Sequence, residues 1–64
     1  MYRVYYTWIN RGGTTHIDAN TMEGAKALMN AKFRAYHNLM AAAIENMDTC
    51  ERLEFYGPTD EGEN

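Results

Sequence analysis

The spacing of apolar residues along the chain changes near residues 17–21. Before this point apolar and polar residues alternate, as they do in a strand with one face buried. After it the apolar residues recur every three or four positions, as they do on one face of a helix. The change predicts a chain that begins with strands and continues with a helix.

The first residues predict a hairpin of two strands. Residues 2–9 are rich in aromatic and β-branched side chains, which favour strands, and residues 10–13 end in glycines that can adopt positive φ in a turn. The second strand covers residues 14–17, with Ala19 as its furthest limit. It is short and polar, as edge strands often are.

A helix is predicted to begin at Thr21, with Asn20 as its cap and Glu23 reaching back in a capping box. Its apolar face continues to Met47. A straight helix of that length would measure roughly 40 Å, against about 26 Å for an eight-residue strand. We therefore expect a break near residues 37–38, the alternative being an apolar overhang covered by a second copy of the chain.

A third strand is predicted at residues 51–56, where Leu53 and Phe55 alternate with polar neighbours. The fold class is α+β, a three-stranded antiparallel sheet with one long or broken helix on one face, in the order β-β-α-β. Residues 1–57 form a single small domain. Residues 58–64 are polar and acidic and are expected to be a disordered tail.

One face of this sheet is predicted to pack under the helix, burying Val4, Tyr6 and Trp8 with Leu53 and Phe55. The opposite face would stay uncovered. Aromatic residues and arginine are enriched where proteins bind each other, and this face combines them. It defines a candidate partner-binding surface made of Arg3, Tyr5, Thr7, Arg52, Glu54 and Tyr56.

A simpler interpretation treats these six residues as ordinary cross-strand pairs, for example Arg3 with Glu54, and is the one we favour. Another alternative is nucleic-acid binding, because aromatic side chains on an open sheet can stack bases and the helix carries a basic stripe that could contact phosphates. That stripe consists of Lys26, Asn30, Arg34 and His37.

The charge balance argues against nucleic acid as the partner. The net charge is -3, and residues 1–56 hold six basic and six acidic side chains, so the excess comes from the acidic end of the chain. Phosphate contacts dominate nucleic-acid affinity, and a neutral body with an acidic end offers little attraction.

The cellular location is inferred from what the chain lacks. Cys50 is the only cysteine, so an intrachain disulfide is excluded, and neither an export signal nor an apolar run of membrane-spanning length occurs. Since the chain opens at Met1, we read it as a whole small gene product, soluble and located in the reducing cytoplasm.

Few residues suggest chemistry. His16 and Asp18 fall on one side of the second strand, and a histidine oriented by a carboxylate is a common acid-base pair, but two polar side chains facing water on an edge strand are a simpler explanation. Metal-ligand spacing and a glycine-rich phosphate loop are absent, so no cofactor or metal is expected.

We expect Cys50 to be a small apolar residue at the entry of a strand. Lys32 lies inside the apolar helix face, where its stem can pack while its ammonium reaches water; an interface cation is the alternative.

Residues 15–26, with the sequence Thr-His-Ile-Asp-Ala-Asn-Thr-Met-Glu-Gly-Ala-Lys, combine a short strand, a capped helix start and an Ala-Lys pair. In this passage the chain resembles the strand-to-helix passage of small phage accessory proteins, including some of the anti-CRISPR type. The resemblance covers about a fifth of the chain. It implies a role in blocking a host complex by binding, and it assigns no site residue.

The sequence therefore predicts a small non-enzymatic protein-binding protein, with inhibition of a host complex in the manner of phage proteins as the implied role. A nucleic-acid-binding module is the alternative, and a small enzyme using His16 ranks last. The expected partner is another protein, with a homodimer left open.

Overall fold

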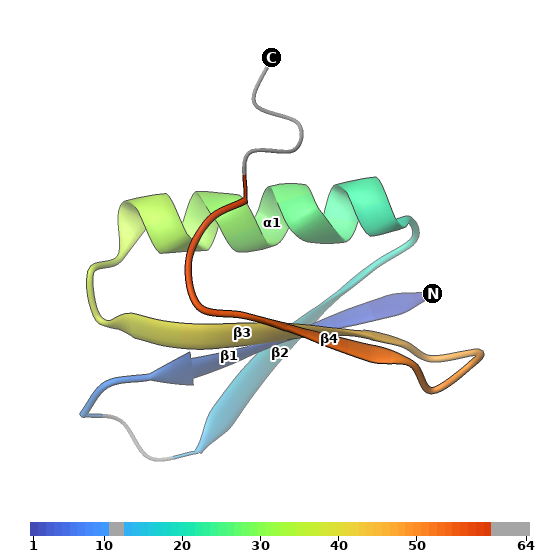
Figure 1. Cartoon of the computed structure of the whole chain (residues 1–64), viewed down its shortest axis with the longest axis horizontal. Coiled ribbons are helices and arrows are strands. Elements are labelled where there is room, and N and C mark those ends of the chain that lie inside the picture. The colour runs from blue at the N-terminus through green and yellow to red at the C-terminus, as the bar shows by residue number, and fades with distance from the viewer. Residues whose placement is uncertain (11–12, 60–64) are drawn as a thin grey trace.

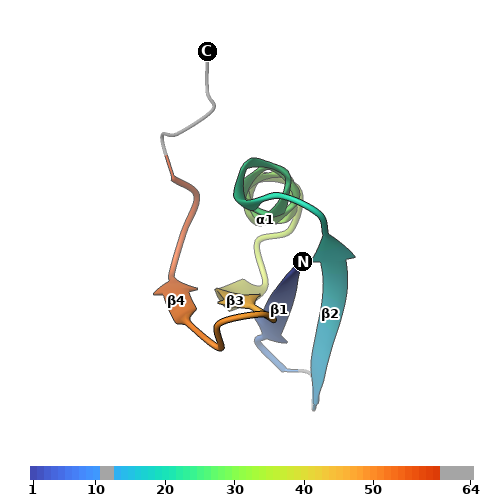
Figure 2. The same ribbon diagram turned by 90° about the vertical axis from the view of Figure 1, so that its right-hand side faces the viewer.

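The computed structural model describes residues 1–10 and 13–59, in which a four-stranded antiparallel sheet carries one helix on one face (Figure 1). The helix runs across the sheet as a second layer and leaves the other face without a cover in the described residues (Figure 2). In chain order the elements are β1 Tyr2–Trp8, β2 Thr14–Ala19, α1 Met22–Ala35, β3 Leu39–Asn46 and β4 Arg52–Phe55.

The sheet order is β2-β1-β3-β4, so β1 and β3 are central and β2 and β4 are the edges. The predicted α+β class is confirmed, but the number of strands was wrong. The chain adds β3 in the region predicted as the second half of the helix. The sheet therefore has four strands rather than three, and β4 pairs with β3 rather than with the hairpin.

The end of the helix agrees closely with the prediction, whereas the segment after the helix does not. α1 ends at Ala35 and Tyr36 is already extended, close to the break expected at residues 37–38. The chain then returns beneath the helix as a strand. Ala42 and Ile44 point toward α1 and are buried, and Ala43 is buried on the opposite side of β3. Alanine favours helices intrinsically, but pairing of β3 with β1, and of residues 42–45 with β4 as well, outweighs that preference.

The helix begins with a different cap from the one predicted. The Thr21 hydroxyl, rather than the side chain of Asn20, accepts a hydrogen bond of 3.0 Å from the backbone N–H of Gly24. Thr21 has extended backbone angles, as a cap residue should, and occupies the position directly before Met22. Glu23 lies in the first turn, where a negative charge is favourable, but the capping box with Asn20 is wrong.

The core lies between α1 and the two central strands. Its buried members are Val4, Tyr6, Ala25, Met29, Leu39, Ala42 and Ile44, with Trp8 and Phe55 half-buried against them. Leu53, predicted to be buried, is 51% exposed. The reason is that α1 contacts β1, β2 and β3 but not β4, which lies beyond the helix in Figure 2.

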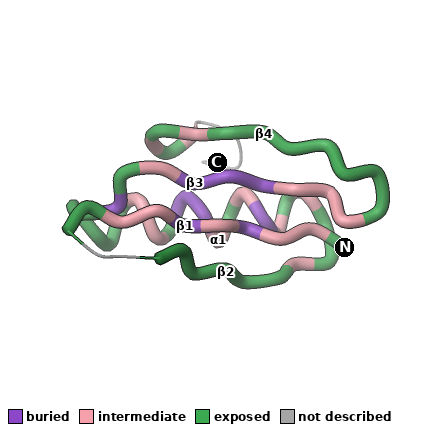
Figure 3. Tube along the Cα trace, turned by 90° about the horizontal axis from the view of Figure 1, so that it is seen from below, coloured by how far each residue is buried: buried purple, intermediate pink, exposed green. Residues whose placement is uncertain are grey.

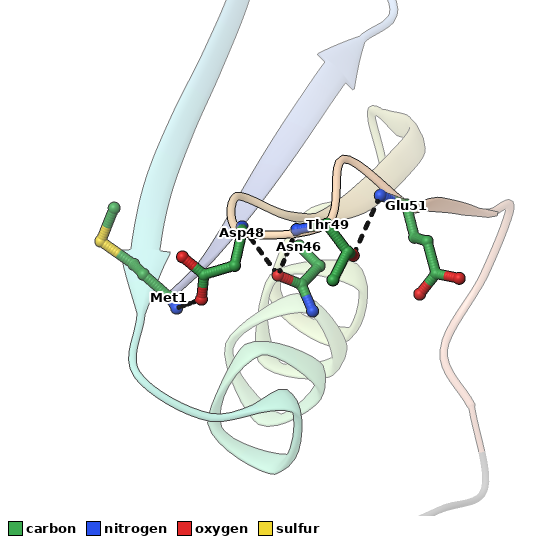
Figure 4. Close-up of polar contacts among 5 residues, drawn as sticks. All are labelled: Met1, Asn46, Asp48, Thr49 and Glu51. Atoms are coloured by element: carbon green, nitrogen blue, oxygen red, sulfur yellow. Dashed lines mark hydrogen bonds and ion pairs between the residues drawn. The ribbon is translucent and has the colours of Figure 1, made fainter.

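The turn between β3 and β4 is organised by Asn46, whose side-chain oxygen accepts hydrogen bonds from the backbone N–H groups of Asp48 and Thr49 (Figure 4). The N-terminal ammonium of Met1 lies 3.3 Å from the Asp48 carboxylate and attaches the start of β1 to this turn. Cys50 has a positive φ of 66° and is exposed. The prediction of an apolar residue at the strand entry is therefore wrong for Cys50.

The segment after β4 leaves the sheet and rises toward α1 (Figure 1). Thr59 reaches the helix, where its backbone N–H donates a 2.9 Å hydrogen bond to the side-chain oxygen of Asn30. Of the predicted tail, residues 60–64 lie outside the described residues. None of the helices in the described part has the length and apolar character needed to cross a bilayer.

Candidate binding surface

The face of the sheet away from α1, called the open face here, is turned toward the viewer in Figure 3. All six residues of the predicted partner-binding surface lie on this face. Strand register explains this, because directly paired residues point to the same side of a sheet. Tyr5 pairs with Ala43 of β3, which pairs with Glu54 of β4. Arg3 is likewise connected through Glu45 to Arg52. Thr7 pairs with Ala41 just before the register shift between β1 and β3, and Tyr56 lies directly after β4.

A hollow of about 120 Å³ lies in the middle of the open face. The small side chains of Ala41 and Ala43 form its floor, since β3 is flanked there by larger residues on both sides. Tyr5 and Thr7 form one wall, and the other wall is formed by Arg52, Glu54 and Tyr56. A line of alanines between aromatic and charged neighbours thus produces a shallow cavity on a surface that would otherwise be flat.

The two walls of the hollow contact each other at one end. The Arg52 guanidinium lies 5.1 Å from the centroid of the Tyr5 ring, a cation-π distance. Arg52 also lies 3.8 Å from carboxylate oxygens of Glu45 and Glu54. These are long, exposed ion pairs of little energetic value, so the guanidinium keeps donors for a partner.

The other end of the hollow is formed by Tyr56, whose hydroxyl donates a 3.1 Å hydrogen bond to the carboxylate of Glu54. This hydrogen bond raises the pKa of Tyr56, because the neighbouring negative charge disfavours the phenolate. Tyr56 is 76% exposed, more than any other large apolar or aromatic residue that the structure describes. Tyr56 therefore presents an aromatic surface that nothing in the described chain covers.

Arg3 has a closer partner than the one suggested by the simpler interpretation. Its guanidinium donates two hydrogen bonds to Asp18 of β2, at 2.8 and 3.3 Å. The suggested pair of Arg3 with Glu54 is wrong, because β3 separates β1 from β4. The Arg3 guanidinium lowers the pKa of Asp18 and holds this carboxylate ionised at neutral pH.

His16 also lies on the open face but does not share Asp18 as an orienting group. Its ring centroid is 5.8 Å from that of Tyr5, and the Asp18 oxygens accept the hydrogen bonds from Arg3. Within residues 1–10 and 13–59, no three histidine, cysteine, aspartate or glutamate side chains are grouped closely enough to hold a metal ion.

The second candidate, the basic stripe of the helix, is interrupted in the structure. Asn30 is only 5% exposed and its amide is hydrogen bonded to Thr59. Arg34 and His37 are exposed and Lys26 is half-buried, with His37 beyond the end of α1. The four residues therefore do not form a continuous stripe, because Asn30, in the middle of the predicted stripe, is buried.

Lys32 lies against an aromatic cluster near the end of α1. Its ammonium nitrogen is 5.3 Å from the ring centroid of Tyr36 and 5.9 Å from that of Tyr6. Tyr36 in turn packs edge-on against Trp8, with centroids 5.4 Å apart. A charged residue on the apolar helix face is thus accommodated by two rings, a form of packing that the sequence pattern did not predict.

Sequence reasoning missed the β3 members of the open face, namely Ala41, Ala43 and Glu45, because their segment was predicted to be helical. The alanines carry no signal of their own, since alanine suits both a helix and a tightly packed strand. Glu45 could have been found only once the segment was recognised as a strand, where it alternates with Ile44.

Comparisons with protein families, with curated proteins and with solved structures found no match for this chain. The resemblance of residues 15–26 to phage accessory proteins therefore stays a hypothesis.

Proposed function

We propose that this chain is a non-enzymatic protein-binding protein that docks the open face of its sheet onto another protein. The observation that carries the proposal is the hollow floored by Ala41 and Ala43 and walled by Tyr5, Arg52 and Tyr56. Binding energy at protein interfaces concentrates in aromatic and arginine residues around small, well-packed pockets. The open face supplies both parts of that arrangement.

The composition of the open face indicates what the partner should present. The alanine floor accepts one apolar side chain, and the exposed ring of Tyr56 adds a flat apolar wall beside it. Arg52 and Glu54 lie next to each other and offer both signs of charge. We therefore expect a partner that inserts an aliphatic or aromatic side chain and surrounds it with polar groups of both charges.

Nucleic acid is the weaker candidate for the same surface. Asp18, Glu45 and Glu54 place carboxylates between the basic and aromatic residues of the open face. These carboxylates would repel a phosphate backbone, and the net charge of the chain is -3. The phage-protein resemblance suggests a host protein complex as the partner, with inhibition as the consequence of binding.

The proposal is tested by affinity purification from host lysate with immobilised wild-type protein and three variants. Tyr5→Ala and Tyr56→Ala remove the walls of the hollow, and Ala41→Leu fills it without removing any group. Each is expected to lose the bound partner while the circular dichroism spectrum stays unchanged. The matched control is Arg34→Ala on the helix, which should retain the partner.

Two outcomes of this experiment would contradict the proposal. Equal recovery of the partner by the three open-face variants would exclude the hollow as its binding site. Loss of recovery with Arg34→Ala, together with sensitivity to nuclease and a steep dependence on salt, would favour the nucleic-acid alternative.

A further inference from the structure

The outer edge of β4 is unpaired within the described residues, since β4 is the last strand of the sheet. Such an edge presents backbone N–H and C=O groups that can pair with another strand. On the helix side, α1 does not reach β4, and a groove of about 380 Å³ lies there, lined in part by Tyr2, Met22, Ile44 and Leu53. Leu53 projects on this side and is 51% exposed.

The sequence of β4 is complementary to itself. A two-fold axis perpendicular to the sheet places two copies of β4 antiparallel and sets same-face residues opposite each other. When the axis passes through Leu53, the two Leu53 side chains meet on the helix side. On the open face, Arg52 of each copy then lies opposite Glu54 of the other. The neighbouring symmetric registers, centred on Arg52 or Glu54, would place like charges opposite each other.

The rows of side chains that cross the open face lead to the same register. One row alternates in charge from Asp18 through Arg3 and Glu45 to Arg52. At β4 this row ends on the Arg52 guanidinium. The next row on the open face, which runs through Tyr5 and Ala43, ends on the carboxylate of Glu54. A second copy in the register centred on Leu53 extends each row with a charge of the opposite sign.

The other edge, β2, offers a weaker version of this arrangement. Its central aliphatic residue, Ile17, is 41% exposed, and His16 and Asp18 flank it. Asp18 is already hydrogen bonded twice by Arg3, whereas the ion pairs of Arg52 are long, at 3.8 Å. The helix also contacts β2. The groove beside β4 and the longer, weaker ion pairs of Arg52 therefore favour β4 over β2 as the edge that pairs with a second copy.

From these observations we infer that two copies of this chain associate through β4, in antiparallel register about Leu53, and form a continuous eight-stranded sheet. Both helices lie on one side of this sheet, and the two open faces form one surface on the other. Arg52 and Glu54 also line the hollow, whereas Leu53 does not, and self-association is measured without a partner, so self-association and partner binding can fail separately.

The test uses the mass in solution of the full chain over a concentration series, measured by sedimentation equilibrium. Arg52→Glu gives a chain with carboxylates at both positions, and Glu54→Arg gives one with two guanidinium groups. Each variant alone should dimerise at least about tenfold more weakly than the wild type, because two attractive cross-strand pairs become repulsive. An equimolar mixture should recover dimers that contain one chain of each kind, identified by native mass spectrometry.

A second pair of variants tests the interface without changing any charge, and it still gives an answer if one of the charge variants fails to fold. Leu53→Ser should weaken the dimer, and its matched control Ile17→Ser on the other edge should not. A wild type that stays monomeric over the whole series would overturn the inference. Single charge variants that dimerise like the wild type, a mixture that does not recover dimers, or a greater effect of Ile17→Ser would also overturn it.

Discussion

Asn30 and Thr59 are joined by reciprocal hydrogen bonds that attach the end of the described chain to the middle of α1. The Thr59 backbone N–H donates to the Asn30 side-chain oxygen at 2.9 Å, and the Asn30 amide nitrogen donates to the Thr59 hydroxyl at 3.2 Å. A buried amide needs such partners, and Asn30 is buried, at 5% exposure. The segment after β4 is thus held over the edge of the core.

Replacing Asn30 should therefore cost more stability than replacing its partner. Asn30→Ala removes both hydrogen bonds and should lower the free energy of unfolding by about 1–3 kcal/mol. Thr59→Ala keeps the backbone donor and should cost less. Urea denaturation of both variants measures the difference, with Asn38→Ala as an exposed asparagine control. A smaller effect for Asn30→Ala than for Thr59→Ala would contradict this contact.

The ion pair of Arg3 with Asp18 should make stability depend on pH in the acid range. Arg3 lowers the pKa of Asp18 below its ordinary value of 3.8 in the folded chain. The stabilisation is therefore fully present above pH 3.8 and is lost as the pH falls through the lower, folded-state pKa. Thermal unfolding of wild type and Asp18→Asn should differ at about pH 6 and converge in strong acid. A difference that stays constant down to strong acid would show that the ion pair is not its source.

Cys50 is expected to be a site where glycine increases stability. Its φ of 66° lies in the left-handed region, which costs a residue with a Cβ about 1 kcal/mol relative to glycine. Cys50→Gly should therefore raise the midpoint of thermal unfolding, whereas Cys50→Ala, which also removes the thiol, should leave it nearly unchanged. Equal effects of the two substitutions would trace the gain to loss of the thiol rather than to the backbone.

The hydroxyl of Tyr6 is buried and has no hydrogen-bond partner among the described residues. Burial raises the pKa of Tyr6, consistent with a hydroxyl removed from water. Because an unpaired buried polar group is unfavourable, Tyr6→Phe should stabilise the fold by about 1 kcal/mol. Tyr36→Phe, at an exposed tyrosine, is the control and should be nearly neutral in chemical denaturation. Destabilisation by Tyr6→Phe would mean that the hydroxyl has a partner.

Prediction from the sequence succeeded where side chains have strong preferences. The alternating pattern of Val4 and Tyr6 identified β1 and its buried side, and the end of α1 fell close to the expected break. The open-face positions of Arg3 and Tyr5 follow from the same alternation, because residues on either side of a buried strand residue point away from the core.

Prediction failed at β3, where the decisive information is not local. Residues 41–43 are alanines, whose intrinsic preference is helical and whose size marks neither a buried nor an exposed side. Their conformation is decided by pairing with β1 and β4, contacts that are distant in sequence. Because β3 was not predicted, the alanine floor of the hollow was not predicted either. Leu53 was expected to be buried under the helix, but β3 takes the place beside β1 and Leu53 on β4 lies beyond the helix.

Hydroxyl-radical footprinting of the free and the partner-bound chain would show whether the open face of the sheet binds the protein partner. In the free chain, Tyr56 should be oxidised readily and the buried Tyr6 protected. In the complex recovered from lysate, we expect protection of Tyr5 and Tyr56 with no change at Tyr36 on the helix side. Protection of Tyr36 with Tyr56 still fully reactive would contradict it.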